Sequence, residues 1–448
     1  MVEAVEIQER RARRQEAEHA ECSTSVSDGA GSSKRPTRPA RILYVSPNAC
    51  LFGAERVLLN MLAALDRSRI DPLVLVPEEG ELSTAVREIG VPVFVSRDAY
   101  PLRSASFWRA SAGARRLTRL LKKHRVDIVH LNLWSPYSDI SVVASAVWWS
   151  GASWVIHVQN NMKYSTSYLE PFERYCFTQA DRAICMTRFV ERTLREHSPS
   201  KRWSLQSVRS CVIPGGFVVA RATSGSDSTE ALRRSLGIAP DAPIAGVVAA
   251  LSPIKNQELF LRAAALVRQR FPQAHFLVVG SPYNPQETEY VDQLKRVQAE
   301  LELDSAVQFL GYRRDVPDLM RVMDVMVLPS RTEAFGGVLV EAMAAGTPVV
   351  AAHIDGIPEV VRDGETGFLI AGESPERYAE AMVRLLSDRE LARRFGERGR
   401  VWAAERFDAA SVARQVEAVY AGLCRRGRWE RARLVATAAT LRGLARWL

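Results

Sequence analysis

The chain has 448 residues, of which 47% are hydrophobic and 25% are charged. These proportions are those of a globular protein long enough for two or three domains, and they exclude a mostly disordered or collagen-like chain. The net charge of +9 is concentrated near the C-terminus, where residues 424–448 hold seven arginines and one glutamate. The body of the chain therefore carries only a small positive excess, and we expect no nucleic-acid partner.

No stretch of the sequence predicts a membrane-spanning helix or a signal peptide. The most apolar stretch, 140–158, contains four serines and Gly151 and predicts a short helix, a turn and a strand. Residues 1–38 combine a charged run with a Ser-, Gly- and Pro-rich segment, which predicts a charged, disordered tail. The six cysteines show neither a Cys-x-x-Cys pair nor zinc-ligand spacing. We therefore expect reduced thiols, a cytoplasmic location and no metal site.

Residues 39–220 alternate short apolar strands with helices, which is typical of a parallel sheet covered on both faces. The first strand ends at Pro47, and a loop containing Gly53 leads into the first helix. The expected strands are Arg41–Ser46, Leu73–Pro77, Val91–Val95, Ile128–Leu131, Trp154–Val158, Ala183–Met186 and Val212–Pro214, and the expected helices are Ala54–Leu65 and Ala110–His124. This part of the chain predicts a first Rossmann-like domain.

The pattern restarts after a small, polar segment that we take as a linker at 221–230. Residues 231–405 predict a second Rossmann-like domain, and a helix at 406–423 is expected to cross back to the first. The expected strands are Ile244–Ala249, His275–Val279, Val307–Leu310, Val325–Leu328 and Pro348–Ala351, and the expected helices are Gln257–Arg270, Glu287–Glu300, Val316–Met323, Gly337–Ala345 and Ala409–Leu423. The predicted fold class is α/β, with two doubly wound domains facing each other across a cleft where the strand carboxyl ends bind ligands.

Several common site motifs are absent from the sequence. No strand is followed by G-x-G-x-x-G, and neither G-x-x-x-x-G-K-[ST] nor G-x-S-x-G occurs. These absences argue against a nicotinamide or flavin cofactor, a P-loop and a serine nucleophile elbow. No Asp-x-Asp is present either, so we expect no metal clamp for a nucleotide diphosphate.

A dense block of motif residues lies between Val327 and Ile370. A buried strand ends at Pro329, a loop carries Glu333, and Gly336 and Gly337 open a helix that contains Glu341 one turn inside. Glycines there let a ligand approach backbone N–H groups, and a helix N-terminus favours anions. Two isolated glutamates eight residues apart are ordinarily solvated, but this pair flanks a glycine-rich helix start. The block therefore predicts a site for a phosphate flanked by sugar hydroxyls.

The motif around these glutamates resembles the signature of retaining glycosyltransferases of family 4, which have the GT-B fold. Residues 329–349 read P-S-x-x-E-x-F-G-x-x-x-x-E-A-M-A-x-G-x-P-V. The remaining matches, spread over residues 40–422, are Gly356-Ile-Pro-Glu359, Asp363-Gly-Glu-Thr-Gly367, Arg41–Ser46, Gly53-Ala-Glu-Arg56, Asp127-Ile-Val-His130, Ala180-Asp181, Val278-Val-Gly280 and Phe309-Leu-Gly311. The resemblance implies metal-independent transfer of a sugar from a nucleotide-sugar donor bound by the second domain to an acceptor bound by the first.

The resemblance also implies roles for individual residues. Glu333 would contact donor-sugar hydroxyls, Glu341 would hold the ribose, and Lys255 would contact the diphosphate. The backbone N–H groups of Gly336, Gly337 and Val338 would stabilise the departing diphosphate together with Lys255. The base is expected near Tyr312, and Gly53 belongs to the glycine loop of the first domain. The alternative for Lys255 is a solvated lysine at a helix start.

The sequence departs from the family pattern in three places. The arginine that usually precedes the lysine is Ala250 here, so one expected phosphate cation is missing, and Arg331 is our first candidate to replace it. The usual histidine after a first-domain strand is replaced by Val155-Ile-His157-Val-Gln159-Asn160. Either His157 fills that role from a shifted position or Gln159 replaces it. The segment Pro214-Gly-Gly216-Phe-Val218 lacks the usual Asn and Asp, which affects the hinge.

Two other interpretations stay open. A binding or scaffold protein of the same fold that has lost activity would explain Ala250, but Glu333, Glu341 and Lys255 are all retained. An epimerase or phosphorylase of this fold is the other alternative, although no cofactor lysine motif is apparent. The acceptor would be a glycan, a lipid-linked molecule or a small molecule, and its binding loops would include 132–137 and 160–168.

The basic C-terminal segment 424–448 predicts an amphipathic helix. On a helical wheel its arginines gather on one side and its leucines on another, with Trp429 and Trp447 beside the leucines. This pattern is typical of a helix lying on an anionic membrane surface, here the inner face. The alternatives are a helix packed on the first domain and a solvated tail.

Overall fold

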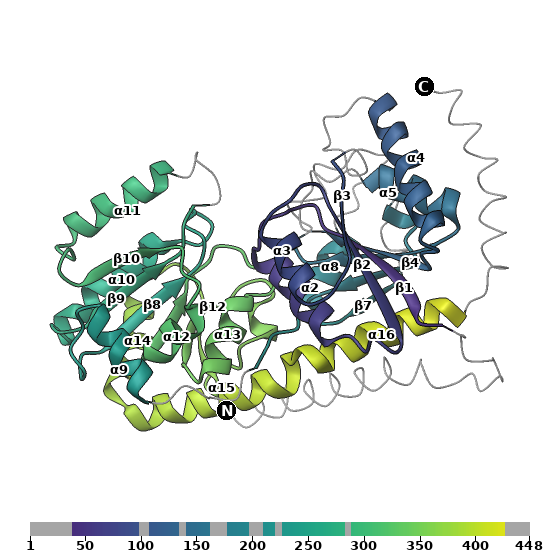
Figure 1. The fold of residues 1–448 in the computed structure, drawn as a ribbon. Coiled ribbons are helices and arrows are strands. Elements are labelled where there is room, and N and C mark those ends of the chain that lie inside the picture. Colours follow the sequence, from purple (N-terminus) through teal and green to yellow (C-terminus); the bar gives the residue numbers. More distant parts are fainter. Residues whose placement is uncertain are drawn as a thin grey trace.

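The computed structural model describes residues 38–97, 107–133, 140–161, 177–196, 209–219, 226–282 and 288–425. Two layered domains lie side by side, and each holds a parallel sheet between helices (Figure 1). Nearly all of the expected tail 1–38, and the segment 426–448, lie outside the described residues. Within the described ranges no helix is both long and apolar enough to cross a membrane.

The first domain is built on a seven-stranded sheet of order β3-β2-β1-β4-β5-β6-β7. Its strands are β1 (Ala40–Val45), β2 (Ile70–Val76), β3 (Val93–Val95), β4 (Ile128–Leu133), β5 (Ser153–Val158), β6 (Arg182–Cys185) and β7 (Ser210–Val212). Its helices are α2 (Gly53–Ala64), α3 (Glu81–Glu88), α4 (Phe107–Lys123), α5 (Ile140–Ser150) and α8 (Arg188–Glu196). All neighbouring strands are parallel, so their carboxyl ends share one edge of the sheet.

Alternation along β1 shows why this apolar segment forms a central strand. Successive side chains point to opposite faces of a sheet. Ile42 and Tyr44 enter the core that contains Leu58 of α2, whereas Leu43 enters the core that contains Val143 of α5. A segment buried on both faces needs an apolar residue at nearly every position, as this one has.

The second domain is built on a six-stranded parallel sheet of order β10-β9-β8-β11-β12-β13. Its strands are β8 (Ile244–Val248), β9 (His275–Val279), β10 (Val307–Gly311), β11 (Val325–Leu328), β12 (Val349–Ala352) and β13 (Gly367–Ile370). Its helices are α9 (Ser226–Ser235), α10 (Gln257–Arg270), α11 (Thr288–Glu300), α12 (Val316–Val322), α13 (Gly337–Ala345), the short η4 (Ile357–Glu359), α14 (Pro375–Ser387) and α15 (Arg389–Phe407). Two apolar cores lie on its two faces.

These two sheets confirm the expected α/β class with two doubly wound domains. Strand β13 and helices α3, α8, α14 and α15 were not among the expected elements. Helix α15 was missed because Gly396 and Gly399, within a highly charged stretch, predict an interruption of a helix. In the structure they allow close packing: a Cβ at Gly396 would lie 2.1 Å from the carbonyl oxygen of Gly346, and one at Gly399 would lie 3.1 Å from Met343.

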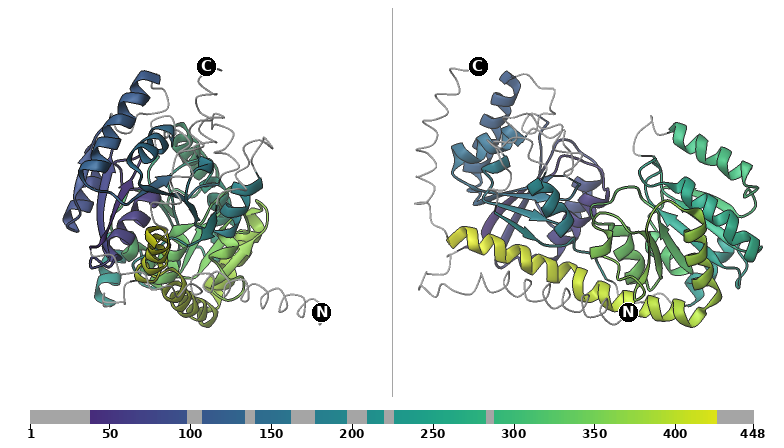
Figure 2. Two further views of the ribbon diagram at one scale, coloured as in Figure 1. Left: turned by 90° about the vertical axis from the view of Figure 1, so that its right-hand side faces the viewer. Right: turned by 180° about the vertical axis from the view of Figure 1, so that it is seen from behind.

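Two helices, α9 and α16 (Ala409–Arg425), lie where the chain passes between the domains. Helix α9 begins at Ser226 and occupies the second half of the segment expected to be a linker at 221–230. The last two helices run beneath the domains, with α15 under the second domain and α16 under the first (Figures 1 and 2). The α16 residues Val412, Val416 and Tyr420 are buried in the first-domain core, so α16 packs on the first domain as the sequence predicts.

A carboxylate of the second domain caps a helix of the first. Glu359 Oε2 accepts a hydrogen bond of 2.7 Å from the backbone N–H of Arg188, and Oε1 accepts one of 2.8 Å from that of Phe189. Nearby, the Thr187 hydroxyl donates to the carbonyl oxygen of Ala334 at 3.0 Å. These contacts hold the loop after β11 against the start of α8, with the two domains closed on each other.

Candidate functional site

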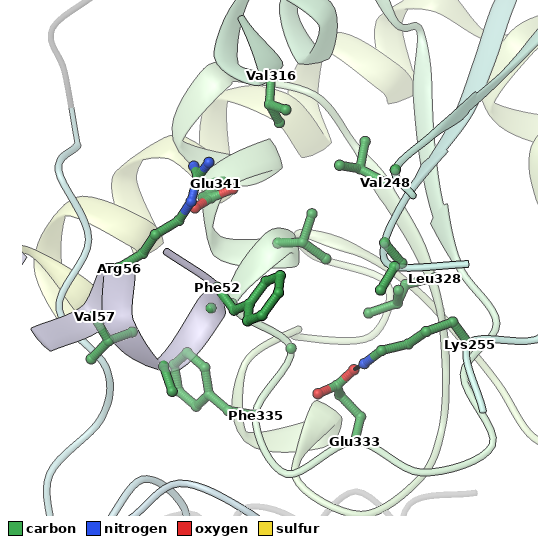
Figure 3. A pocket seen from close by; sticks show the side chains of 18 of the residues that line it. Phe52, Arg56, Val57, Val248, Lys255, Val316, Leu328, Glu333, Phe335 and Glu341 are labelled. Carbon is green, nitrogen blue, oxygen red and sulfur yellow. Dashed lines mark hydrogen bonds and ion pairs between the residues drawn. The ribbon is translucent and has the colours of Figure 1, made fainter. Parts of the chain in front are cut away.

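The two domains enclose a cleft at the carboxyl ends of both sheets (Figure 3). Its cavity of about 330 Å³ is within the range of about 300–1,000 Å³ for small-molecule sites. Of the residues singled out from the sequence, those that line it include Gly53, Gln159, Ala250, Lys255, Tyr312, Glu333, Gly336, Gly337, Val338 and Glu341. The cleft thus brings together segments that follow β1, β8, β10 and β11, as expected at the switch points of two doubly wound sheets.

The start of α13 forms the floor of this cleft. Gly336 has a positive φ of 83°, which a glycine adopts without strain, and it places the first residues of α13 against the cavity. A Cβ at Gly337 would lie 2.7 Å from the ring of Phe217, so only glycine fits there without displacing that ring. The first N–H groups of a helix have no partner within it, and those of Gly337 and Val338 are therefore suited to bind an anion.

Lys255 and Glu333 meet at one end of the cleft. The Lys255 ammonium forms an ion pair with the Glu333 carboxylate, and their side chains are only 20% and 16% exposed (Figure 3). The loop of Glu333 is held by Asp355, whose carboxylate accepts hydrogen bonds from the Glu333 N–H at 3.1 Å and from the Thr332 hydroxyl. The structure thus fixes one cation and one hydrogen-bond acceptor next to the helix start.

Glu341 lies at the opposite end of the cleft. It sits one turn inside α13 and faces the guanidinium of Arg56, which comes from α2 of the first domain (Figure 3). Burial raises the pKa of Glu341, and the positive charge of Arg56 opposes that rise. The sequence analysis named Arg56 only as part of the glycine-loop match and assigned it no role in the site, because only the packing of the two domains brings it to Glu341.

The loop after β10 supplies the wall next to Glu341. Tyr312 lines the cleft and remains 48% exposed. Arg313 also lines it, and its guanidinium donates two hydrogen bonds to Asp315, at 2.8 and 2.6 Å. These bonds lower the pKa of Asp315 and hold the arginine in place. A flat aromatic ring beside an apolar wall that includes Val248 and Val316 suits a nucleotide base.

The structure places His157 away from the cleft. His157 is 2% exposed and lies inside β5, with its ring centroid 5.4 Å from that of His130, and burial lowers its pKa to about 4. Gln159 follows the carboxyl end of β5 and lines the cleft, and its side-chain NH₂ donates to Asn132. Of the two candidates from the sequence, the geometry therefore favours Gln159 and excludes His157 from direct contact with a ligand.

Arg331 is also directed away from the cleft. Its guanidinium pairs with Glu373, with a closest distance of 2.9 Å, and donates to the carbonyl oxygen of Pro253 at 2.9 Å. The pairing raises the pKa of Arg331 and lowers that of Glu373. Ala250 lines the cleft as expected, but Arg331 does not stand beside it, so our first candidate for the missing cation was wrong.

Aromatic rings close the cleft from below. Phe217, in the segment between the domains, stacks on Phe335 with a centroid distance of 5.9 Å and an interplanar angle of 3°. Phe335 in turn meets the edge of Phe407. The sequence showed only that Asn and Asp are missing from this hinge segment, whereas the structure shows that Phe217 packs against the start of α13. Among the described residues, no group of three or more His, Cys, Asp or Glu is placed to hold a metal ion.

Comparisons with known families agree with this geometry. The family model of glycosyl transferases group 1 matches residues 228–402, and that of the glycosyl transferase 4-like domain matches residues 52–214. The D-inositol 3-phosphate glycosyltransferase of Corynebacterium efficiens is 35% identical over 217 residues, which are 47% of this chain and 50% of that protein. The chain therefore spans about half the length of the curated relatives it matches.

Solved structures share the whole two-domain architecture. Anabaena HepE, solved in complex with UDP-glucose, superposes with a TM-score of 0.72 at 24% identity, covering 85% of this chain and 99% of HepE. A glycosyltransferase from Rickettsia africae gives a TM-score of 0.72 at 19% identity, covering 87% of this chain and all of that one. These structures confirm the GT-B fold. With one family model matching each domain, the chain belongs to the family 4 glycosyltransferases of the GT-B fold.

Proposed function

We propose that this protein moves a sugar from a nucleotide-diphosphate-sugar to an acceptor hydroxyl with retention at the anomeric carbon and without a metal ion. One observation carries the proposal: the carboxylate of Glu333, the N-terminus of α13 and the carboxylate of Glu341 follow one another along a single cleft. Glu333 stands at the sugar end, Gly337 and Val338 in the middle, and Glu341 at the nucleoside end. That order matches the order of groups in a nucleotide-sugar.

In the proposed reaction the bond between the anomeric carbon and the diphosphate oxygen breaks, and the anomeric carbon becomes oxocarbenium-like. Negative charge then develops on the diphosphate, where Lys255 and the N–H groups at the start of α13 stabilise it because they are already in place. The acceptor hydroxyl attacks from the same face of the sugar. Its proton passes to the departing phosphate oxygen, so no side chain needs to act as general base.

The proposed substrates follow the same division between domains. The donor is a nucleotide-sugar, and uridine diphosphate sugars are the first to test because HepE was solved with UDP-glucose. The acceptor is a glycan, a lipid-linked molecule or a small molecule bound from the first-domain side, where Gln159 and Asn160 line the cleft. We propose that the enzyme works in the cytoplasm, with 424–448 attaching it to the inner face of the membrane.

A thermal-shift screen against a panel of nucleotide-sugars tests the proposed function. A donor at 100 times its Kd stabilises the folded protein by roughly 2.7 kcal/mol, which is easily measured. Binding together with slow donor hydrolysis supports a transferase. Binding without turnover, with or without acceptor extracts, would favour the scaffold alternative, and the absence of binding to any donor would contradict both.

A further inference from the structure

The first domain places an unexpected cation in the donor cleft. Arg56 lies on α2, one turn after the glycine loop, and lines the same cavity as Ala250 and Lys255. Its guanidinium extends across the cleft to the Glu341 end of α13 (Figure 3). It also lines a second cavity that adjoins the first on the other side of Glu341, so Arg56 stands where the two cavities meet.

Three cations line the donor cleft, and two of them already have strong partners. Lys255 is paired with Glu333, and Arg313 is held by Asp315 through two hydrogen bonds. The Arg56 side chain forms no hydrogen bond or ion pair with any residue that the structure describes; Glu341 is the carboxylate it faces. Arg56 is thus the cation of the described cleft that is best able to accept a new anionic partner.

The absence of a charged side chain at Ala250 indicates a function for Arg56. Ala250 presents only a methyl group where the family pattern has an arginine, which leaves Lys255 as the one second-domain cation expected on the diphosphate. A diphosphate bound between Glu341 and Lys255 would lie in front of the start of α13. Arg56 belongs to the opposite, first-domain wall of the same cleft, and a guanidinium can donate two parallel hydrogen bonds to one phosphate.

We propose that Arg56 is a donor-binding residue that holds the diphosphate from the first domain and takes over the role of the absent arginine at Ala250. This inference rests on the proposed function and adds to it a consequence for domain closure. Since Lys255 belongs to the second domain and Arg56 to the first, the diphosphate charge is fully neutralised only when the domains are closed. Donor binding and domain closure are therefore coupled.

The test compares UDP with uridine, each measured by calorimetry on the full chain. Arg56→Ala should weaken UDP binding about 10- to 100-fold, the range expected for a charge-assisted hydrogen bond, while uridine binding changes less than about threefold. Adding Ala250→Arg to that variant should restore part of the UDP affinity. The UDP affinity of Arg56→Lys should lie between that of wild type and that of Arg56→Ala, because lysine keeps the positive charge but lacks the planar N–H donors of the guanidinium.

Two arginines that do not line the donor cleft serve as matched controls. Arg314→Ala removes a cation that pairs with Glu81 across the domains, and Arg331→Ala removes our first candidate; both should bind UDP like wild type. Equal UDP affinity of Arg56→Ala and wild type, or a loss in Arg331→Ala instead, overturns the inference. An equal loss of uridine and UDP would assign Arg56 to the ribose and also overturn it. If wild type itself binds no nucleoside diphosphate, it is the proposed function that fails.

Discussion

The ion pair between Lys255 and Glu333 has two consequences for catalysis. The ammonium of Lys255 and the carboxylate of Glu333 neutralise each other, so their burial costs less than that of either charge alone. In the proposed reaction the donor places its diphosphate and its sugar next to this pair. The lysine then gains a second anionic partner, and that interaction strengthens as charge develops on the leaving group.

Lys255→Ala should therefore lower kcat by about 100-fold or more, as the loss of one preorganised donor does in other enzymes. Steady-state turnover of the donor found in the screen is the measurement. Arg262→Ala, which removes an exposed cation paired with Glu258 on α10, is the control and should turn over like wild type. Activity of Lys255→Ala within about threefold of wild type would show that the lysine does not contact the reacting groups.

Substitutions of Glu333 and Glu341 should have different effects on UDP binding. Glu341→Gln should weaken binding of free UDP, because the ribose contact exists before the reaction. Glu333→Gln should lower kcat and leave UDP affinity nearly unchanged, because its partner is the donor sugar. Calorimetry with UDP and turnover with the full donor distinguish the two, and equal losses in both variants would refute the assignment of roles.

Glu341 also carries a pH dependence of stability. Because burial raises its pKa in the folded state, the folded state binds this proton more tightly than the unfolded state does. The carboxylate therefore costs nothing at a pH below the unfolded pKa and destabilises the fold once the pH rises through the folded pKa. Glu341→Gln should consequently be at least as heat-stable as wild type at neutral pH, even though it binds UDP less well. A lower Tm at neutral pH would mean that the attraction between Glu341 and the positive charge of Arg56 outweighs the cost of burying the carboxylate.

Site residues that belong to one continuous motif could be predicted from the sequence, and those that depend on domain packing could not. Glu333, Gly336, Gly337 and Glu341 follow one buried strand within nine residues, so their proximity is local. Arg56 is brought to them only by closure of the first domain. The end of β5 at Val158 was predicted correctly. The choice between His157 and Gln159 depended instead on which of the two side chains reaches the cleft, and only the packing of the domains determines that.

At the scale of whole elements, apolar strands were the strongest signal in the sequence. Ten or more short runs of buried Val, Ile and Leu place the strands of both sheets to within a few residues. Helices α14 and α15 gave a weaker signal because their outer faces are charged and α15 contains two glycines. The helix-to-helix contact that requires those glycines is a property of the packed domain and leaves no local pattern.

The contact between Glu359 and the start of α8 stabilises the closed arrangement of the two domains. A carboxylate that accepts two backbone N–H groups at a helix start also interacts favourably with the helix dipole. Because the carboxylate and the helix belong to different domains, this stabilisation exists only while the domains are closed. Opening the cleft leaves the N–H groups to water.

Glu359→Ala should therefore shift the protein toward open conformations. We expect a larger radius of gyration by small-angle scattering and a rise in the donor KM of several fold, with kcat less affected. Glu365→Ala, which removes an exposed carboxylate paired with Arg362 on the same domain, is the control. An unchanged scattering profile and KM in Glu359→Ala would show that other contacts alone hold the domains closed.

At the scale of the molecule, α15 and α16 connect the two domains, and α16 is anchored in the first domain. The Tyr420 hydroxyl lies 2.7 Å from His130 Nδ1 and 3.1 Å from the Tyr44 hydroxyl. The buried carboxylate of Glu417 accepts a hydrogen bond of 2.8 Å from the Asp66 N–H. Since α15 and α16 are consecutive, the C-terminal part of the chain leaves the second domain and ends on the first. Arg425, the last residue of α16, therefore lies next to the first domain, which we propose to bind the acceptor.

The position of Arg425 beside the first domain bears on the membrane binding that the sequence predicts for the basic segment 424–448. A helix with arginines on one face and leucine and tryptophan on another binds anionic membranes through both apolar burial and charge. Each basic residue near an anionic leaflet contributes roughly 1 kcal/mol, and salt screens this attraction. An enzyme attached in this way would hold its first domain close to a lipid-linked acceptor.

Truncation after Arg425 tests this arrangement, because the cut leaves α16 and its buried contacts complete. Full-length protein should sediment with vesicles containing phosphatidylserine at low salt, bind less as salt rises, and bind poorly to phosphatidylcholine vesicles. The truncated protein should lose vesicle binding while donor hydrolysis continues, since the described residues that line the cleft all lie before the cut. If both proteins bind anionic vesicles equally, the membrane contact lies elsewhere on the molecule. If truncation instead lowers the Tm and vesicles bind neither form, the segment packs on the first domain, because its removal then uncovers apolar surface that it buries in the folded state.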